Sequence, residues 1–535
     1  MGAFEDIGFT LANRLETYVT TNLSGLWKQV QRVPALHRLV NRILIDRAIL
    51  KIPTRPNPLS TMAGYTSWAS LTDRTYDSRH LPPADGAAAG QPPAEEVARL
   101  FNREGEMTPC EKSTVLFPYF AEWFVDGFLR SERPQRDPET GAIIRDPDTG
   151  ELVRDPAKNE SNHEIDLVQI YGLDEAVTRQ LRTGEGGLLK YQLIGGEEYP
   201  PYLYENGRKR FDKVTVVRDE QITGDQRRQL FAFGSDTGNL QLGFVMMGVL
   251  FVREHNRIAR MLEKQYGWDD ERLFQTARNI LTVILIKIVV EEYINHISPF
   301  HLKLLADPTG FRNPRWYRQN WMAIEFNLLY RWHSLVPSSF RIGDRDVAVN
   351  DTLFNTDIVI ERGLAVCFED ASGQRAGRVG LFNSPPEVWD AEVASIKQAR
   401  AVGLQPYNEY RHFARFPRAK RFEDVSSDPR VQQRLRDVYG HVDAIEFYPG
   451  LFAEDVRRNA VLPSLIGRMV AIDAFSQAFT NPLLSPRVFN PETFSPLGWD
   501  LIRRTSTLSD LVHRNVPDPG RPLKIAMTRP DWVRS

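Results

Sequence analysis

The chain has 535 residues, 42% hydrophobic and 25% charged, which is typical of a globular protein with one large or two closely packed domains. Its formal net charge is −2, so no global charge imbalance points to nucleic acid as a partner. Two cysteines, Cys110 and Cys367, are too few for a disulfide framework or a metal cluster, which fits a reducing compartment.

Residues 1–52 predict short amphipathic helices, because apolar residues recur at helical spacing with lysines and arginines between them. Such helices either lie on a membrane surface or cover the core of the main domain, and the pattern leaves both open. The first residues show no basic region followed by an apolar stretch. We therefore expect a cytoplasmic protein, peripheral at the inner face of the membrane if these helices bind lipid. The apolar run 280–290 is too short to span a bilayer and predicts a buried helix.

Residues 53–535 are predicted to form one large, mainly α-helical domain, since strands with period-two patterns are scarce. Helical apolar patterns cover residues 113–131, 236–306, 320–334 and 388–480. Residues 133–160 hold three copies of Arg-Asp-Pro and two Thr-Gly pairs, which are turn formers and predict an exposed insertion. The aspartates of this insertion leave calcium binding open, although their spacing matches no known calcium loop.

The segment 325–337 (EFNLLYRWHSLVP) carries the residues with the clearest chemistry. Tyr330 and His333 are three residues apart, a spacing that places both on one face of a helix. A neutral imidazole can bind haem iron, and a nearby phenol can lose a hydrogen atom and become a radical. On the spacing alone, a hydrogen-bonded core histidine is the more common case.

The same segment resembles the proximal-haem helix of the cyclooxygenases, the prostaglandin H synthase branch of the animal haem peroxidases, here of a bacterial type. The resemblance extends over about residues 40 to 520, with further similar segments at 189–201, 253–257, 268–278, 408–411 and 443–449. It implies a large helical haem-peroxidase-like domain that holds haem b. It also implies that His333 is the axial ligand of the haem iron and that Tyr330 carries the catalytic radical.

Other roles follow from the same resemblance. Tyr293 matches the tyrosine that hydrogen-bonds the radical tyrosine, and Tyr448 matches a proximal-side tyrosine near the axial histidine. Arg47 matches the arginine that binds the fatty-acid carboxylate at the channel mouth. For these three residues the alternative is ordinary packing or surface charge. For His255, in a similar segment, we expect a hydrogen-bonded core residue.

The sequence departs from the family on the distal side, where a Gln and a His are expected four residues apart. Glu122 and Asp126 stand at these positions. Two carboxylates near haem would repel each other, so we expect one to hold a proton near neutral pH. Either a carboxylate serves as the acid–base group or the peroxidase function has been lost, and both readings stay open. His163 is a further distal-side candidate, and Phe300 replaces the tyrosine of the channel mouth.

The expected function is haem-dependent dioxygenation of an unsaturated fatty acid by dioxygen through a tyrosyl radical, with weak or altered peroxidase activity. The alternatives are a plain haem peroxidase acting on small reductants and a non-catalytic haem-binding protein. The sequence leaves the fatty acid and the formation of a homodimer open.

Overall fold

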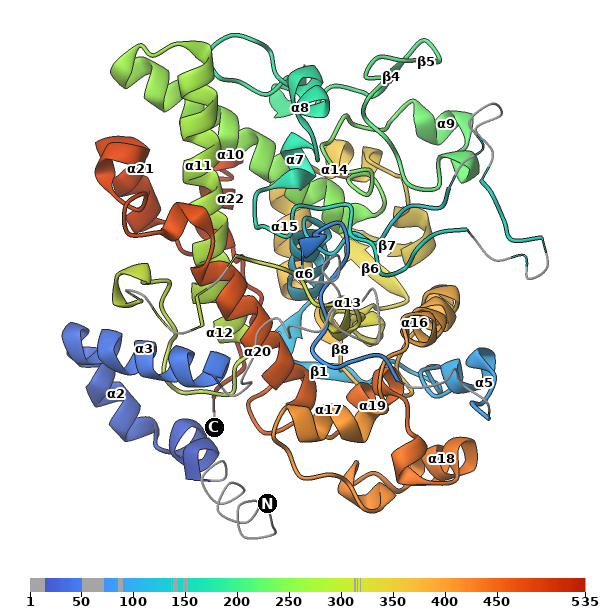
Figure 1. Ribbon diagram of the computed structural model, residues 1–535. Helices are drawn as coiled ribbons and strands as arrows, with labels where there is room; N and C mark the ends of the chain where they lie inside the picture. Colours follow the sequence, from blue (N-terminus) through green and yellow to red (C-terminus); the bar gives the residue numbers. More distant parts are fainter. Residues whose placement is uncertain are drawn as a thin grey trace.

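The computed structural model describes residues 15–50, 72–84, 90–135, 137, 143–147, 150, 153–311, 314, 316–317 and 319–534. The fold is mainly α, as predicted (Figure 1). Its α-helices include residues 15–22, α2 (Ser24–Arg32), α3 (Pro34–Leu50), α5 (Ala94–Ala98), α6 (Leu116–Asp126), α7 (Val168–Tyr171), α8 (Glu175–Leu181), α9 (Gly224–Arg227), α10 (Leu242–Tyr266), α11 (Asp270–Ile288), α12 (Asn295–Ile297), α13 (Ile324–Leu329), α14 (Asp357–Arg362), α15 (Leu364–Gly373), α16 (Trp389–Ala401), α17 (Tyr407–Phe413), α18 (Pro429–Tyr439), α19 (Phe447–Ala453), α20 (Ser464–Phe479), α21 (Pro491–Arg504) and α22 (Leu508–Asn515).

Strands contribute little to the fold. Within the described residues they form four antiparallel pairs. These pairs are β1 (Pro109–Thr114) with β8 (Arg375–Gly377), β2 (Gln192–Ile194) with β3 (Glu197–Tyr199), β4 (Tyr204–Glu205) with β5 (Arg208–Lys209), and β6 (Ser339–Ile342) with β7 (Arg345–Ala348).

The long helices α10 and α11 form an antiparallel pair at the centre of the fold (Figure 1). They reverse direction just after Gly267, whose φ of +60° lies in the left-handed region that glycine adopts without strain. Helix α6 packs on α10, and α21 packs on α11. The run 280–290 is buried except for the half-buried Lys287, which confirms the predicted buried helix. The stretch Asp270–Ile297 has the length and composition of a membrane span, but most of it is enclosed by the fold, as in core helices.

Helix α11 ends in a π-helical turn, η2 (Val289–Ile294), before α12 begins. A π-turn holds one more residue than an α-turn and therefore re-aims the side chains that follow it. Tyr293 lies in this turn and is fully buried. The irregularity thus sets the direction of one of the expected site residues.

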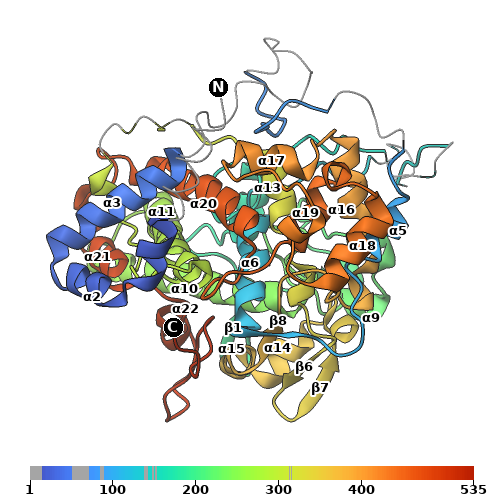
Figure 2. The same cartoon turned by 90° about the horizontal axis from the view of Figure 1, so that it is seen from below.

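The N-terminal helices lie together at one side of the molecule, where α3 packs on α20 (Figures 1 and 2). Their inner face is buried, with Ile45 and Ile49 in the main core and Trp27 and Val30 in a smaller cluster with Leu302. Their outer face is also apolar. Nine large hydrophobic side chains of this segment are exposed: Leu15, Tyr18, Leu23, Leu26, Val33, Leu36, Leu39, Ile43 and Leu50.

The repeat insertion projects from the body of the molecule (Figure 1). Its described residues between 137 and 150 are exposed or half-buried. The chain then returns to the body, where Asn159 is buried and donates a hydrogen bond to Asp77 at 2.7 Å. The last part of the insertion is therefore integral to the domain.

Candidate functional site

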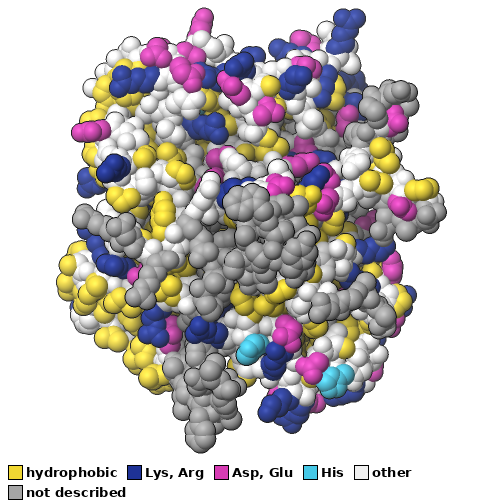
Figure 3. Space-filling view, in the orientation of Figure 1, with side chains coloured by type: hydrophobic (Ala, Val, Ile, Leu, Met, Phe, Trp, Pro, Cys, Tyr) yellow, Lys and Arg dark blue, Asp and Glu magenta, His cyan; other side chains and the backbone are white. Residues whose placement is uncertain are grey.

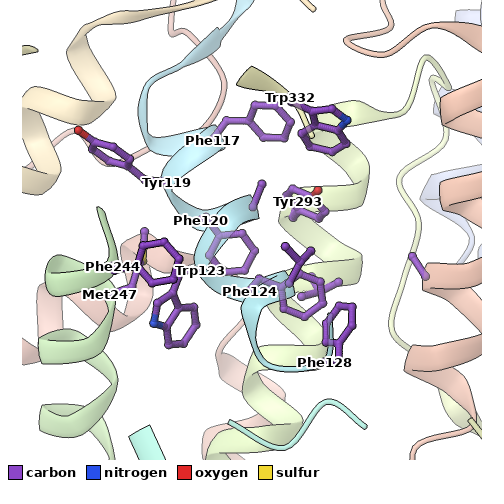
Figure 4. Close-up of a cluster of buried hydrophobic side chains, with 14 of the residues drawn as sticks. Phe117, Tyr119, Phe120, Trp123, Phe124, Phe128, Phe244, Met247, Tyr293 and Trp332 are labelled. Carbon is purple, nitrogen blue, oxygen red and sulfur yellow. The ribbon is translucent and has the colours of Figure 1, made fainter. Parts of the chain in front are cut away.

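One face of α6 is an aromatic ridge that packs on the π-turn (Figure 4). The ring centroids of Phe117, Phe120 and Phe124 lie 5.6, 5.6 and 6.1 Å from that of Tyr293. Trp123 points the other way and packs on Phe251 of α10 at 4.5 Å. Aromatic pairs at these distances hold both partners in fixed orientations, so α6 and Tyr293 form one rigid unit.

The polar face of α6 carries Glu122 and Asp126, one helical turn apart. The Oδ2 atom of Asp126 accepts hydrogen bonds from Arg130 at 3.0 Å, Ser235 at 2.6 Å and Thr237 at 2.7 Å. Arg130 also pairs with the buried Asp236. Asp126 is therefore fixed inside a network of donors.

Glu122 has a different environment. Its Oε2 atom accepts a hydrogen bond from Gln241 at 2.9 Å, and its side chain is exposed. Although this side chain is exposed, desolvation by the protein packed around it raises the pKa of Glu122 to about 7, with His333 opposing the rise and Asp126 adding to it. Glu122 is therefore able to exchange a proton near neutral pH.

The proximal turn corrects the predicted helical geometry. Helix α13 ends at Leu329, and Tyr330 caps it with φ −103° and ψ 11°. His333 then begins a separate 3₁₀ turn, η4 (His333–Leu335). The two side chains are therefore not on one face of a single helix. The bulky Tyr330-Arg331-Trp332 run leaves the helix because Trp332 turns inward to stack on Phe117 at 5.7 Å.

Tyr330 is held by aromatic contacts. Its ring lies 4.7 Å from Trp332 and 4.9 Å from Phe326. The hydroxyls of Tyr330 and Tyr293 are both buried without a hydrogen-bond partner of good geometry, yet each is close enough to affect the pKa of the other. Burial raises the pKa of both phenols above the ordinary value, so both are neutral at physiological pH.

His333 faces a buried carboxylate that the sequence did not reveal. Its Nδ1 atom lies 3.1 Å from Oε1 of Glu392, which is 1% exposed. The same carboxylate accepts hydrogen bonds from Tyr448 at 2.6 Å and from Ser384 at 2.6 Å. A carboxylate beside Nδ1 favours the tautomer with hydrogen on that nitrogen, which leaves the lone pair of Nε2 for a metal. Tyr448 therefore does lie on the histidine side, and it reaches His333 through Glu392.

A cavity of about 440 Å³ lies between Asp126 and helix α16, within the usual size range of ligand pockets. Its cationic lining fits a ligand with carboxylates. Five arginines line it, and two of them, Arg130 and Arg133, pair with Asp236. The other three are Arg154, Arg218 and Arg331. Arg154 comes from the end of the repeat insertion, so that segment contributes to the cavity.

These residues fit a haem. His333 offers an imidazole nitrogen for iron, and the arginine-lined cavity beside Asp126 offers cations for two propionates. His333 would hold the iron, and Arg154 and Arg331 would pair with the propionates. Among the described residues, no cluster of three or more His, Cys, Asp or Glu side chains could hold another metal ion. Part of the aspartate-rich insertion lies outside those residues.

A second, apolar cavity lies beneath α3, between the end of η2 and helix α20. It is lined by Leu44, Ile45, Ile294, Ile297, Phe300, Val470 and Phe475, among others. Phe300 is thus at a cavity wall, as the resemblance implied. Arg47 is not in the lining. Its side chain is 58% exposed and pairs with Glu16 at 3.2 Å.

The ring nitrogens of two other histidines contact groups outside this site. His255 is fully buried, and its two ring nitrogens contact the Tyr171 hydroxyl at 2.8 Å and the Gly187 carbonyl at 2.9 Å. This confirms the expected core role. His163 is also buried, with Nε2 at 2.8 Å from the Arg74 carbonyl and Nδ1 accepting from the Met322 amide at 3.1 Å. Both nitrogens are engaged with backbone, so His163 is not placed as a distal acid–base group.

Comparison with known proteins agrees with this geometry. A model of the animal haem peroxidase family matches residues 127–526. The chain is 34% identical over 515 residues to prostaglandin G/H synthase 2 of Equus caballus, covering 93% of this chain and 80% of the relative. It is 31% identical over 511 residues to prostaglandin G/H synthase 1 of Mus musculus, with the same coverage.

Two solved structures share the fold. Peroxidase A from Dictyostelium discoideum has a TM-score of 0.68 at 19% identity, covering 88% of this chain and 99% of that chain. The fatty acid alpha-dioxygenase of Oryza sativa has a TM-score of 0.63 at 16% identity, covering 96% and 94%. Fold and site together define an oxidoreductase of the haem-peroxidase type. The chain belongs to the animal haem peroxidase family, whose members include the prostaglandin G/H synthases it matches, and haem is the cofactor this membership implies.

The contact between Glu392 and His333 gives a testable prediction. Glu392→Gln should keep haem binding but weaken it about 10- to 100-fold, as loss of a partner behind a metal-binding histidine does. It should also raise the iron reduction potential, because a neutral amide donates less charge to the imidazole. His333→Ala should abolish the normal Soret band. Haem titration and spectroelectrochemistry measure both effects, and an unchanged potential in Glu392→Gln would contradict the contact.

Proposed function

We propose that this protein is a haem-dependent oxygenase that adds dioxygen to an unsaturated fatty acid through a radical on Tyr330. The observation that carries the proposal is the position of the Tyr330 and Tyr293 phenols. Tyr330 lies three residues before His333 and adjoins Tyr293, which directly precedes the cavity residue Ile294. Similarity to prostaglandin G/H synthases over 93% of the chain supports it.

Each step of the reaction places a demand on a side chain. Bound haem supplies the oxidising power that removes a hydrogen atom from Tyr330. Tyr293 and Trp332 hold the phenol in place, and the dry site protects the radical from water. The Tyr330 radical takes a hydrogen atom from an activated methylene of the lipid, and dioxygen adds to the carbon radical. The resulting peroxyl takes the hydrogen atom back from Tyr330, which gives a hydroperoxide and restores the radical.

On the distal side, we propose that Glu122 moves the proton and that Asp126 positions the helix. Asp126 has three donors on one oxygen, whereas Glu122 borders open space. A group with a pKa near the working pH is the better acid–base catalyst. This arrangement supports weak peroxidase activity. A non-catalytic haem protein is the second candidate function. The observation in its favour is that hydrogen bonds hold the Asp126 carboxylate in one position.

We further propose a peripheral position at the inner face of the membrane, in contact with anionic lipid. Nine of the fourteen exposed large hydrophobic side chains found among the described residues belong to residues 15–50. The lower left of Figure 3 shows this apolar surface beside basic side chains. Apolar burial together with Lys28, Arg32, Arg38 and Arg42 suits an anionic bilayer surface. Neither calcium nor a homodimer is part of this proposal.

Replacing Tyr330 tests the radical. Tyr330→Phe keeps the ring and removes a buried hydroxyl without a partner of good geometry, so the free energy of unfolding should change by less than about 1.5 kcal/mol. Haem binding should persist, and oxygen uptake with linoleate should be lost. Tyr293→Phe should only reduce the uptake. Oxygen uptake by Tyr330→Phe at the wild-type rate would refute the radical mechanism.

Peroxidase activity tests Glu122. Because a base must be deprotonated, peroxide turnover should rise as the pH passes through about 7, the pKa to which burial raises Glu122. Glu122→Gln should remove this inflection and lower turnover by about 10²-fold or more. Stopped-flow rates across pH at equal haem content measure this. The same inflection in the Gln variant would assign it to another group.

Vesicle binding tests the membrane contact. The full chain should co-sediment with vesicles that contain phosphatidylserine, and less so at high salt, because screening weakens the attraction of Lys28 and the arginines. Leu36→Glu with Leu39→Glu should reduce binding without disturbing the core, since both side chains are exposed. A matched pair at Leu173 and Leu193, exposed elsewhere, should have no effect. Equal loss in both pairs would favour nonspecific adhesion.

A further inference from the structure

The apolar cavity beneath α3 contains few charged side chains. Among the described residues in its lining, these are Glu16, Arg457 and Arg468. The rest of the wall is made largely of aliphatic and aromatic groups. An amphiphile that enters such a space buries its chain against the wall and needs a partner for its head group.

Arg457 and Arg468 stand at one end of this cavity. Both also line an adjoining pocket of about 470 Å³, and so do Thr17 and Phe416. The adjoining pocket extends to Tyr18, which is 59% exposed and belongs to the apolar outer face of the N-terminal helices. The two arginines therefore lie where the pocket that reaches the exposed Tyr18 adjoins the apolar cavity.

The Arg468 guanidinium is positioned by neutral groups. Its Nη1 atom donates to the Ala414 carbonyl at 3.0 Å, and its central carbon lies 4.3 Å from the centroid of the Phe416 ring. Arg457 lies 6.0 Å from the same centroid. Burial lowers the pKa of Arg468 to about 10, and the attraction of Glu16 only partly offsets this. Nearby Arg411, in contrast, pairs with Glu454 at 2.5 Å. Arg468 is thus a desolvated cation whose electrostatic balance an entering anion would improve.

The lining of the same cavity also includes Ile294 and Phe475. Ile294 follows Tyr293 directly in the π-turn, and Tyr293 adjoins Tyr330. The expected anchor, Arg47, lies outside the cavity and pairs with Glu16. Phe300, which lines the cavity, has no hydroxyl group that could donate a hydrogen bond to a carboxylate. The cavity therefore has cations in its lining and, at Ile294, a residue that directly follows Tyr293.

We propose that Arg468, with Arg457 beside it, binds the carboxylate of the fatty acid, while the hydrocarbon chain extends along the apolar cavity toward Tyr293 and Tyr330. This inference rests on the proposed function and specifies its substrate site. A guanidinium matches a carboxylate with two parallel hydrogen bonds. The distance from Arg468 to Tyr330 then selects the methylene that meets the radical.

Calorimetric binding of linoleate to the haem-loaded protein tests the anchor, with linoleyl alcohol as the uncharged comparison. Arg468→Gln should weaken linoleate binding about 10- to 100-fold and leave binding of the alcohol nearly unchanged. Arg468→Lys should recover part of the loss, since it restores the charge without the planar fork. Arg504→Gln, an exposed arginine of α21 that pairs with Asp500, controls for the change in net charge and should have no effect.

The outcomes separate the anchor from the function. If the wild-type protein binds and oxygenates linoleate, and Arg468→Gln binds linoleate equally well, the proposed role of Arg468 is wrong while the proposed function stands. A loss in Arg47→Gln instead would return the role to Arg47 and overturn the proposal. Equal weakening of acid and alcohol by Arg468→Gln would show a packing defect and also overturn it. If the wild-type protein neither binds nor oxygenates linoleate, the proposed function itself fails.

Discussion

The buried carboxylate of Glu392 ties the histidine side of the site together. A carboxylate removed from water costs several kcal/mol unless donors and positive charge surround it. Ser384, Tyr448 and His333 surround this one, and they come from three separate parts of the chain. Helix α16, helix α19 and turn η4 must therefore dock together before the carboxylate is satisfied. The orientation of the His333 ring is a product of that docking.

The distal side is organised by a network of ion pairs. Asp126, Arg130 and Asp236 form a buried network in which each charge has partners on other elements. Such a network fixes geometry, because removing one member leaves its partner uncompensated in a medium of low polarity. Glu122 lies just outside it, with a hydrogen bond from Gln241 and an exposed side chain. Two carboxyls one turn apart thereby acquire different chemistry from their surroundings alone.

The sequence predicted the parts of the site that depend on local patterns. The motif at 325–337 identified Tyr330 and His333, and the apolar patterns identified the buried helices. The regular helix expected between Tyr330 and His333 was wrong, because the packing of Trp332 against Phe117, which is far away in the sequence, ends α13 early. Glu392 was missed for the same reason. A lone glutamate on a helix is usually a solvated residue, and only the tertiary fold brings it to His333.

The charged residues show the same limit. Arg47 lies in a helix with apolar periodicity on two sides, so no pattern decides which way its side chain faces. In the structure this exposed side chain pairs with the half-buried Glu16. Arg154 follows a turn-rich insertion that reads as exposed, yet it lines the cavity beside α16. Long side chains at the ends of loops and helices are placed by distant neighbours, which a single sequence does not reveal.

The π-turn at Val289–Ile294 changes how this helix should be compared with others. One extra residue in a helical turn rotates everything on one side of it by about 100° relative to a continuous α-helix. An alignment of α11 that assumes unbroken 3.6-residue periodicity will therefore assign the wrong face to residues beyond the turn, Tyr293 among them. A relative that lacks the extra residue would present a different side chain to the phenol of Tyr330, even if the two sequences looked alike. The length of this one turn thus decides which side chain faces the phenol of Tyr330.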